Sequence, residues 1–299
     1  MTTEQNSKDL PDIEVGEDHV LAHNVDDEPV EANRRLFEGG LLKFVAMLAI
    51  AYSAFHLYSL NIAPLETWSF RIVHIAGALV LGFVLFAGAR FVSSEEGGAR
   101  HRWTTWISAG AMLPALYVLY QTFSFWQMVQ NGAMRIPAEL EVWHFGWPLL
   151  AATGAGIVMS WFHQRERSVF SVPGLVLIAC SLAVAAYFRV VYNTSMRMST
   201  GTSFAPVGMS FAAIAGTALI MELTRRVAGM ALVIIGLVFL AYVFAGPYLP
   251  GFLGYPGLSV QRFFSQVHQA AGLPGPPTAV SSTYLSTLLI FGAFLTSSQ

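Results

Sequence analysis

The stretch MELTRRVAGMALVIIGLVFLAYVFAGPYLPG, residues 221–251, places three charged side chains directly before a long apolar run. These charged residues are Glu222, Arg225 and Arg226. The run that follows, 227–248, is long enough for an α-helix to cross the roughly 30 Å hydrocarbon core of a bilayer. Another apolar run, 204–223, precedes the charges. The pattern predicts a helical hairpin in the membrane with the charged residues at its turn.

Apolar runs of similar length recur along the whole chain. Eight qualify, and they cover 41–60, 70–91, 104–126, 142–163, 172–192, 204–223, 227–248 and 279–297. They are continuous and longer than the strands of a membrane barrel, so helices are favoured. The chain is 55% hydrophobic and 11% charged, whereas a soluble protein carries about 25% charged residues. The sequence therefore predicts an all-α polytopic membrane bundle of eight transmembrane helices and excludes a soluble globular protein.

The first 38 residues differ in composition from the rest. They hold eleven acidic residues against three basic ones and few large apolar side chains. Such a segment cannot bury enough apolar surface to offset the entropy of ordering. We therefore expect 1–38 to be a disordered acidic tail, which could also anchor a signalling partner at the membrane.

The distribution of Lys and Arg predicts the orientation of the bundle. Cytoplasmic connections of membrane proteins carry an excess of these residues. If the N-terminus is cytoplasmic, eleven of the sixteen Lys and Arg residues lie inside and five outside. Glu222, Arg225 and Arg226 then sit at a cytoplasmic corner as a topological anchor. Glu222 and Arg226, four residues apart, would share a helix face, and as an exposed pair they would add about 0.3–0.5 kcal/mol.

Two histidines and a few charges are the candidates for chemistry inside the membrane. His56 and His74 fall at similar depth on neighbouring runs, where they could form an interhelical hydrogen bond or ligate a haem. Arg71, Arg189 and Glu222 lie near the ends of runs, where long side chains can reach the interface. No charge falls at mid-span depth in the predicted runs, which weighs against a self-contained proton or ion pathway.

A proline cluster precedes the last run, in AAGLPGPPTAVSSTYLS, residues 270–286. Pro277 ends the cluster, and small and hydroxyl residues follow it, among them Ser281, Ser282 and Thr283. An exposed helix N-terminus beside a membrane cavity can bind anionic groups. The alternative is an ordinary capped helix that enters the bilayer. The sequence leaves both interpretations open.

Three ordered segments resemble one transporter family. FHLYSL (55–60), followed by RIVHIAGALVLGFVLF (71–86), is similar to the opening helices of fused TRAP transporter permeases of the TAXI type. ELTRRVAG and the corner FAGPYLP, within 222–251, resemble that family's E-x-T-R-R-V-x-G block and F-G-P-Y-L-P corner. PTAVSSTYLSTLLIFGAFL (277–295) resembles the segment that opens the large transport module. The residues that carry these matches are Phe55, His56, Leu57, Tyr58, Glu222, Arg225, Arg226, Gly246, Pro247, Pro250, Pro277, Ser281, Ser282 and Thr283.

The resemblance implies a secondary transporter of the bacterial inner membrane and not an enzyme. A periplasmic TAXI-type binding protein would deliver an organic acid, and a small membrane module would support a large one, with sodium coupling. Residues 39–250 would be the small module, and 251–299 the linker and first helix of the large one. The chain would depend on the remainder of the large module, lie in the lipid bilayer and bind no nucleic acid.

The chain also departs from the family pattern. The runs 104–126 and 142–163 look like an insertion, and no substrate or sodium residue can be carried over. The resemblance therefore implies the scaffold part of a truncated permease, with no cofactor in this chain. The alternatives are a b-type cytochrome-like redox protein that uses His56 and His74, or a membrane anchor for a partner.

Overall fold

The computed structural model describes residues 33–89, 91, 102–163, 167–192, 205–267 and 274–297. Within these ranges the chain is all-α, and its only bridge outside the helices is an isolated one between Arg34 and Phe86. The helices in chain order are α3 (Gly39–Asn61), α4 (Thr67–Leu85), α5 (Arg102–Gln130), the π-helix η1 (Leu140–Gly146), α6 (Trp147–Phe162), α7 (Val172–Tyr192), α8 (Val207–Ala228), α9 (Met230–Ala245), the 3-10 helices η3 (Gly246–Tyr248) and η4 (Gly251–Leu253), α10 (Val260–Val267), α11 (Pro276–Val280), the π-helix η5 (Ser281–Leu285) and α12 (Ser286–Ser297). The predicted all-α bundle is confirmed.

Every predicted apolar run contains a helix, but the number of candidate spans differs by one. In the described ranges, seven helical segments are long and apolar enough to cross a membrane. The exception is α5, which is helical over 29 residues but mixes Ser, Thr and Gln among its aromatic residues. The chain is a multi-pass helical membrane protein.

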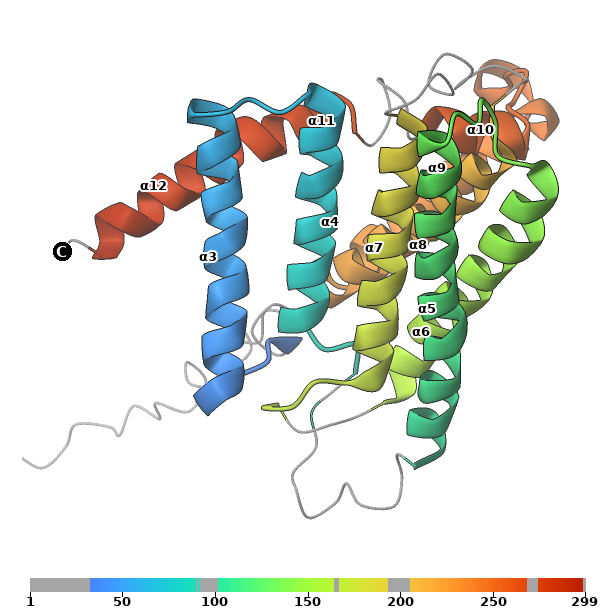
Figure 1. Ribbon diagram of the computed structural model, residues 1–299. Helices are drawn as coiled ribbons and strands as arrows, with labels where there is room; N and C mark the ends of the chain where they lie inside the picture. The colour runs from blue at the N-terminus through green and yellow to red at the C-terminus, as the bar shows by residue number, and fades with distance from the viewer. Residues whose placement is uncertain are drawn as a thin grey trace, which may run out of the picture.

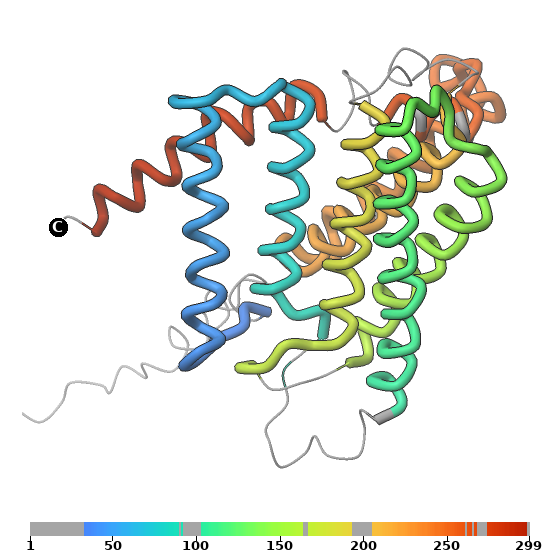
Figure 2. Tube along the Cα trace, in the orientation of Figure 1, coloured from blue at the N-terminus to red at the C-terminus, as the bar shows by residue number. Residues whose placement is uncertain are grey.

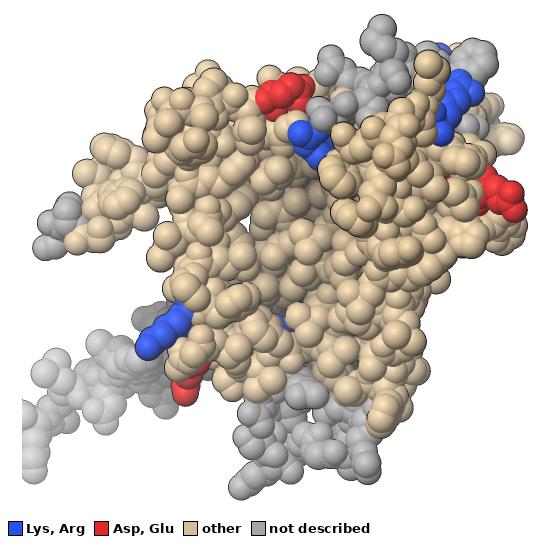
Figure 3. All heavy atoms as spheres, viewed as in Figure 1, with Lys and Arg blue, Asp and Glu red and all other residues tan. Residues whose placement is uncertain are grey.

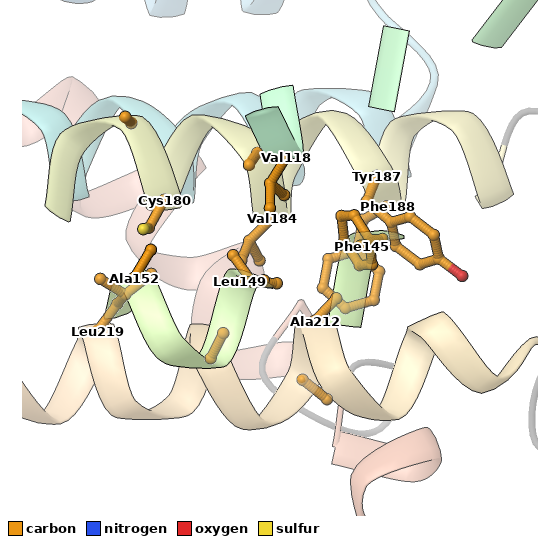
Figure 4. Close-up of a cluster of buried hydrophobic side chains, with 14 of the residues drawn as sticks. Val118, Phe145, Leu149, Ala152, Cys180, Val184, Tyr187, Phe188, Ala212 and Leu219 are labelled. Carbon is orange, nitrogen blue, oxygen red and sulfur yellow. The ribbon is translucent and has the colours of Figure 1, made fainter. Parts of the chain in front are cut away.

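The core of the bundle forms around α7, most of whose residues are buried. Figure 4 shows Cys180, Val184 and Tyr187 of α7 facing Leu149 of α6 and Ala212 of α8, all in one buried cluster. Small side chains at these contacts let helix backbones approach closely, which is how helices associate in a bilayer without a hydrophobic driving force. Cys180, the one cysteine of the chain, is fully buried in this core.

The pair α3 and α4 stands beside the group formed by α5 to α8 (Figure 1). Figure 2 shows the last helices crossing the end of this pair, with α12 projecting past α3 to the C-terminus. No residue of α9 or α12 is buried. These two helices therefore present most of their apolar surface outward.

A short segment before α3 is tied into the bundle. The backbone N–H of Arg35 donates to Leu85 O at 2.8 Å, and that of Ala87 donates to Asn33 O at 2.9 Å. The predicted disorder is therefore wrong for residues 33–38, because 33–35 pair with the end of α4, the Leu36 N–H donates to Arg167 O at 3.1 Å, and Phe37 is buried. Residues 1–32 of the predicted tail lie outside the described residues.

Candidate functional site

The carboxylate of Glu222, in the last two turns of α8, is the centre of a buried ion network. Its Oε1 accepts from Arg226 Nε at 2.8 Å and from Ser160 Oγ at 2.9 Å. Its Oε2 accepts from Arg225 Nε at 2.9 Å and from Trp161 Nε1 at 3.0 Å. One carboxylate on α8 thus joins two arginines of the same helix to the end of α6.

Both arginines continue from this carboxylate to the end of α4. Arg225 Nη2 donates to Gly88 O at 2.7 Å, and Arg226 Nη1 donates to Phe86 O at 3.1 Å. The Arg226 guanidinium also lies over the Phe83 ring, 4.8 Å from its centroid. The last carbonyls of a helix have no partner within the helix, so the arginines supply donors there. The network therefore fastens α4, α6 and α8 together at one end of the bundle.

The structure corrects the expected exposure of this cluster. Glu222 is 3% exposed and Arg226 1% exposed, so the prediction of a solvent-exposed pair is wrong. The predicted shared helix face is confirmed, because α8 continues to Ala228. The reason for the burial is that α4 and α6 end at the same level as α8 and cover the charges.

A second buried cation lies beside the network. Arg35, 4% exposed, donates from Nη2 to Ser171 Oγ at 2.7 Å. Desolvation by burial, and secondly the charge of Arg226, lower the pKa of Arg35 to about 10. Arg226 Nη2 is buried without a hydrogen-bond partner among the described residues. The cluster therefore holds more buried positive charge than Glu222 neutralises.

The histidine pair forms a hydrogen-bonded chain between α3, α4 and η5. His56 Nε2 lies 2.8 Å from His74 Nδ1, and His74 Nε2 lies 3.1 Å from Ser281 Oγ. His56 Nδ1 lies 2.8 Å from the carbonyl oxygen of Tyr52, and the Tyr52 hydroxyl donates to His74 O at 2.9 Å. The interhelical hydrogen bond predicted for the two histidines is present.

These contacts decide which ring nitrogens carry protons. A carbonyl oxygen only accepts, so His56 Nδ1 must carry a proton, and in the neutral ring Nε2 is then an acceptor. His74 Nδ1 therefore donates to His56 Nε2 and also to the Tyr52 hydroxyl oxygen, 2.8 Å away, and in the neutral ring His74 Nε2 accepts from the Ser281 hydroxyl. All four ring nitrogens have protein partners, which does not fit haem ligation, because an axial ligand needs a nitrogen free for iron.

The remaining residues of the first family segment divide between the core and the surface. Phe55 stacks on Phe70 with ring centroids 5.6 Å apart. Leu57 and Tyr58 are exposed, and Tyr58 is among the more exposed aromatic residues of α3. Of these four residues, Phe55 and His56 therefore face the α3–α4 contact.

The corner after α9 is a local structural turn. Gly246 is buried against Tyr255, whose ring would clash with a Cβ added at this glycine. The Tyr255 hydroxyl donates to Val243 O, and the Tyr255 N–H donates to Gly246 O at 3.2 Å. Pro247 lies in η3 and Pro250 directly precedes η4. The turn needs a glycine for close approach and shows no convergence of polar side chains.

The hydroxyl residues at the head of the last span serve two different roles. Ser281 reaches across to His74, whereas Ser282 Oγ and Thr283 Oγ1 donate back to Ala279 O at 3.3 and 2.6 Å. Pro277 lies in the first turn of α11. Of this group, only Ser281 contacts another candidate site residue.

Sequence reasoning missed one buried carboxyl, that of Glu141 in η1, which is 2% exposed. The Tyr187 hydroxyl donates to its Oε1 at 2.7 Å, and the Gly208 N–H donates to its Oε2 at 3.3 Å. The carboxylate thereby caps the first turn of α8, where backbone N–H groups have no partner within the helix. The available signal was that Glu141 directly precedes the apolar run 142–163, two residues after Glu139.

No group of three or more His, Cys, Asp or Glu residues in the described ranges could hold a metal ion. Comparisons of the chain with models of protein families, with curated proteins and with solved structures found no match.

Proposed function

We propose that the chain is the supporting membrane part of a TAXI-type TRAP transporter in the bacterial inner membrane. In this proposal, a periplasmic binding protein delivers an organic acid, and the large transport module moves it with sodium. The chain itself holds its own helices in fixed positions, so that another part of the transporter can move against them. The proposal assigns no substrate or sodium ligand to this chain.

The observation that carries the proposal is the buried network centred on Glu222. The charged residues of the segment that resembles the family's E-x-T-R-R block bind one another and the ends of α4 and α6. Breaking a buried ion pair costs about 3–5 kcal/mol, so these helices are held firmly at one end. Fixed helices of this kind suit a support better than a moving transport element.

The outer helices add to this argument. α9 and α12 bury no residue within the chain, and much of the outward side of α3 is apolar and exposed. In the proposed assembly, lipid and the large transport module cover these helices. The segment 277–295, which resembles the start of that module, lies against α3 and α4 through Ser281 and its neighbours.

The test is to identify what the chain binds in its own host. An affinity-tagged chain is purified in mild detergent, and the membrane and periplasmic proteins that remain bound are identified by mass spectrometry. We expect a large TRAP transport module and a TAXI-type binding protein. Deletion of the gene should abolish uptake of at least one radiolabelled organic acid.

Two results would contradict the proposal. One is recovery of neither partner from membranes that contain the folded chain, together with unchanged uptake in the deletion strain. The other is a haem absorbance band in the purified chain that His56→Phe removes, which would favour a redox protein.

A further inference from the structure

A ligand-sized cavity of about 560 Å³ opens between α3, α4 and α7. Binding cavities for small molecules are roughly 300–1,000 Å³ and mostly apolar, with a few polar groups that orient the ligand. Tyr52 and Arg189 are the polar side chains in this wall, and the other lining residues are apolar. In Figure 3 the same face of the molecule is hollowed between the α3 side and the rest of the bundle.

The cavity is elongated along the helix axes. Its lining residues cover 48–55 on α3, 72–81 on α4 and 182–189 on α7. At 1.5 Å per residue each of these segments runs for about 10–14 Å. Because α4 is antiparallel to α3 and α7, Phe55, Ile72 and Arg189 lie at one end and Leu48, Leu81 and Leu182 at the other. The cavity is therefore an elongated apolar groove with a single cationic side chain at one end.

Arg189 is that cation, and it lies three residues before the end of α7. Among the described residues it has no hydrogen bond or ion pair. Arg71 on the neighbouring helix differs, because its Nη1 donates to Pro274 O at 2.8 Å and its guanidinium lies over Trp68. The other polar group, the Tyr52 hydroxyl, already donates to His74 O. Of the described side chains in this wall, Arg189 is thus the one available for an anionic group at the level of a helix end.

We propose that this cavity binds one anionic phospholipid, with its phosphate at Arg189 and one acyl chain between α3, α4 and α7. A small soluble acid would leave most of the apolar wall without a partner. An acyl chain fills the wall, and at a helix end the phosphate lies at headgroup depth. The bound lipid would join α3 to α4 and α7, which already pack on each other in the core. This inference is independent of the proposed transport function.

The first test measures lipid preference by native mass spectrometry. The full chain is delipidated and equilibrated in mixed micelles that contain equal amounts of phosphatidylglycerol and phosphatidylcholine. Wild type should retain one phosphatidylglycerol in preference to phosphatidylcholine. Arg189→Gln should reduce that preference about fivefold, as expected for one cation near a charged headgroup. The matched control is Arg135→Gln, which removes an exposed arginine of the α5–η1 connection and should leave the preference unchanged.

The second test fills the cavity with a larger side chain. Ala186→Phe, inside the cavity wall, should lower retention of both lipids, whereas Leu175→Phe, at an exposed position of the same helix, should not. Thermal unfolding of each variant checks that it is folded, and if Ala186→Phe fails this check, Arg189→Gln remains decisive.

Two outcomes would overturn the inference. One is equal phosphatidylglycerol retention by folded Arg189→Gln and Arg135→Gln. The other is displacement of the lipid by glycerol phosphate or a soluble dicarboxylate, which would show that the anion alone is recognised and that the acyl chain contributes nothing.

Discussion

At the residue scale, hydrogen-bond donors of the described chain surround the carboxylate of Glu222. Its two oxygens accept from two arginines, a serine and an indole N–H. A carboxylate in this position is stable only while it is ionised and paired. Loss of its charge would leave the Arg226 guanidinium, whose side chain has no solvent exposure, without a counter-charge.

We therefore expect Glu222→Gln to lower the free energy of unfolding by about 3–5 kcal/mol, because the change breaks a buried ion pair. The measurement is denaturant or thermal unfolding of the purified chain in detergent. Glu139→Gln, at an exposed position before η1, is the control and should change stability little. Equal stability of the two variants would show that the network contributes nothing to the fold.

Arg35 should behave differently from Arg226 although both are buried. Arg35 donates to the Ser171 hydroxyl, and the positive charge of Arg226 disfavours the charged form of Arg35. Replacement of a buried ion by an apolar residue of similar volume can be nearly neutral or stabilising. We expect Arg35→Met to cost clearly less unfolding free energy than Arg226→Met in the same assay. A larger loss for Arg35→Met would mean that an anion outside the described residues pairs with Arg35.

At the scale of elements, two polar contacts join helices in addition to the apolar packing. The first is the bond between His74 and Ser281, which are 207 residues apart, and it docks η5 on α4. The second is the bond of Glu141 with Tyr187 and with the first turn of α8. Each contact can be removed by one substitution, with a local effect on one element.

For the first contact, Ser281→Ala should speed hydrogen exchange of amides 278–285, because His74 Nε2 loses its donor. A hydrogen bond of this kind adds about 0.5–1.5 kcal/mol, so exchange should rise severalfold there and stay unchanged in α7. The control is Ser286→Ala, whose hydroxyl donates to Ser281 O within the same helical span, Pro276–Ser297, and to no other described element. If both variants exchange alike, the bond to His74 does not dock η5.

For the second contact, Glu141→Leu should destabilise the start of α8 by about 1–3 kcal/mol, because the Tyr187 hydroxyl is left buried without an acceptor. The double variant Glu141→Leu/Tyr187→Phe should recover part of this loss. The measurement is unfolding free energy of the two single variants and the double variant. Additive losses would show that the two side chains act independently.

The sequence predicted the helices more completely than the contacts of the candidate site. Continuous apolar runs identify helices in a bilayer, because nothing else satisfies the backbone there, and each predicted run contains one. Burial of Glu222 could not be predicted, because the sequence at the end of an apolar run does not show whether water or neighbouring helices cover it. The contact of His74 with Ser281 depends on where the last span docks, and hydropathy does not encode docking. Glu141 was passed over because it stands just before a run.

At the scale of the whole molecule, the orientation in the membrane is open to direct measurement. The single cysteine, Cys180, is fully buried, so an impermeant maleimide should not react with the folded wild type. Glu38 before α3 and Arg135 after α5 are both exposed and lie near opposite ends of the bundle. A cysteine introduced at either position therefore reports one side of the membrane, without a background reaction from Cys180.

The excess of Lys and Arg on one side predicts that the Glu38 side is cytoplasmic. We expect Arg135→Cys to be labelled in intact cells, and Glu38→Cys only after the membrane is disrupted. The reverse result would invert the bundle, and with it the side on which every connection lies. Backbone hydrogen bonds tie residues 33–35 to the end of α4, close to where Arg225 and Arg226 also bind. A cytoplasmic Glu38 therefore also places the ion network on that side. Arg189 lies near the other end of α7, so it would then lie toward the side of the membrane opposite the cytoplasm, and the phospholipid that we propose would come from that leaflet.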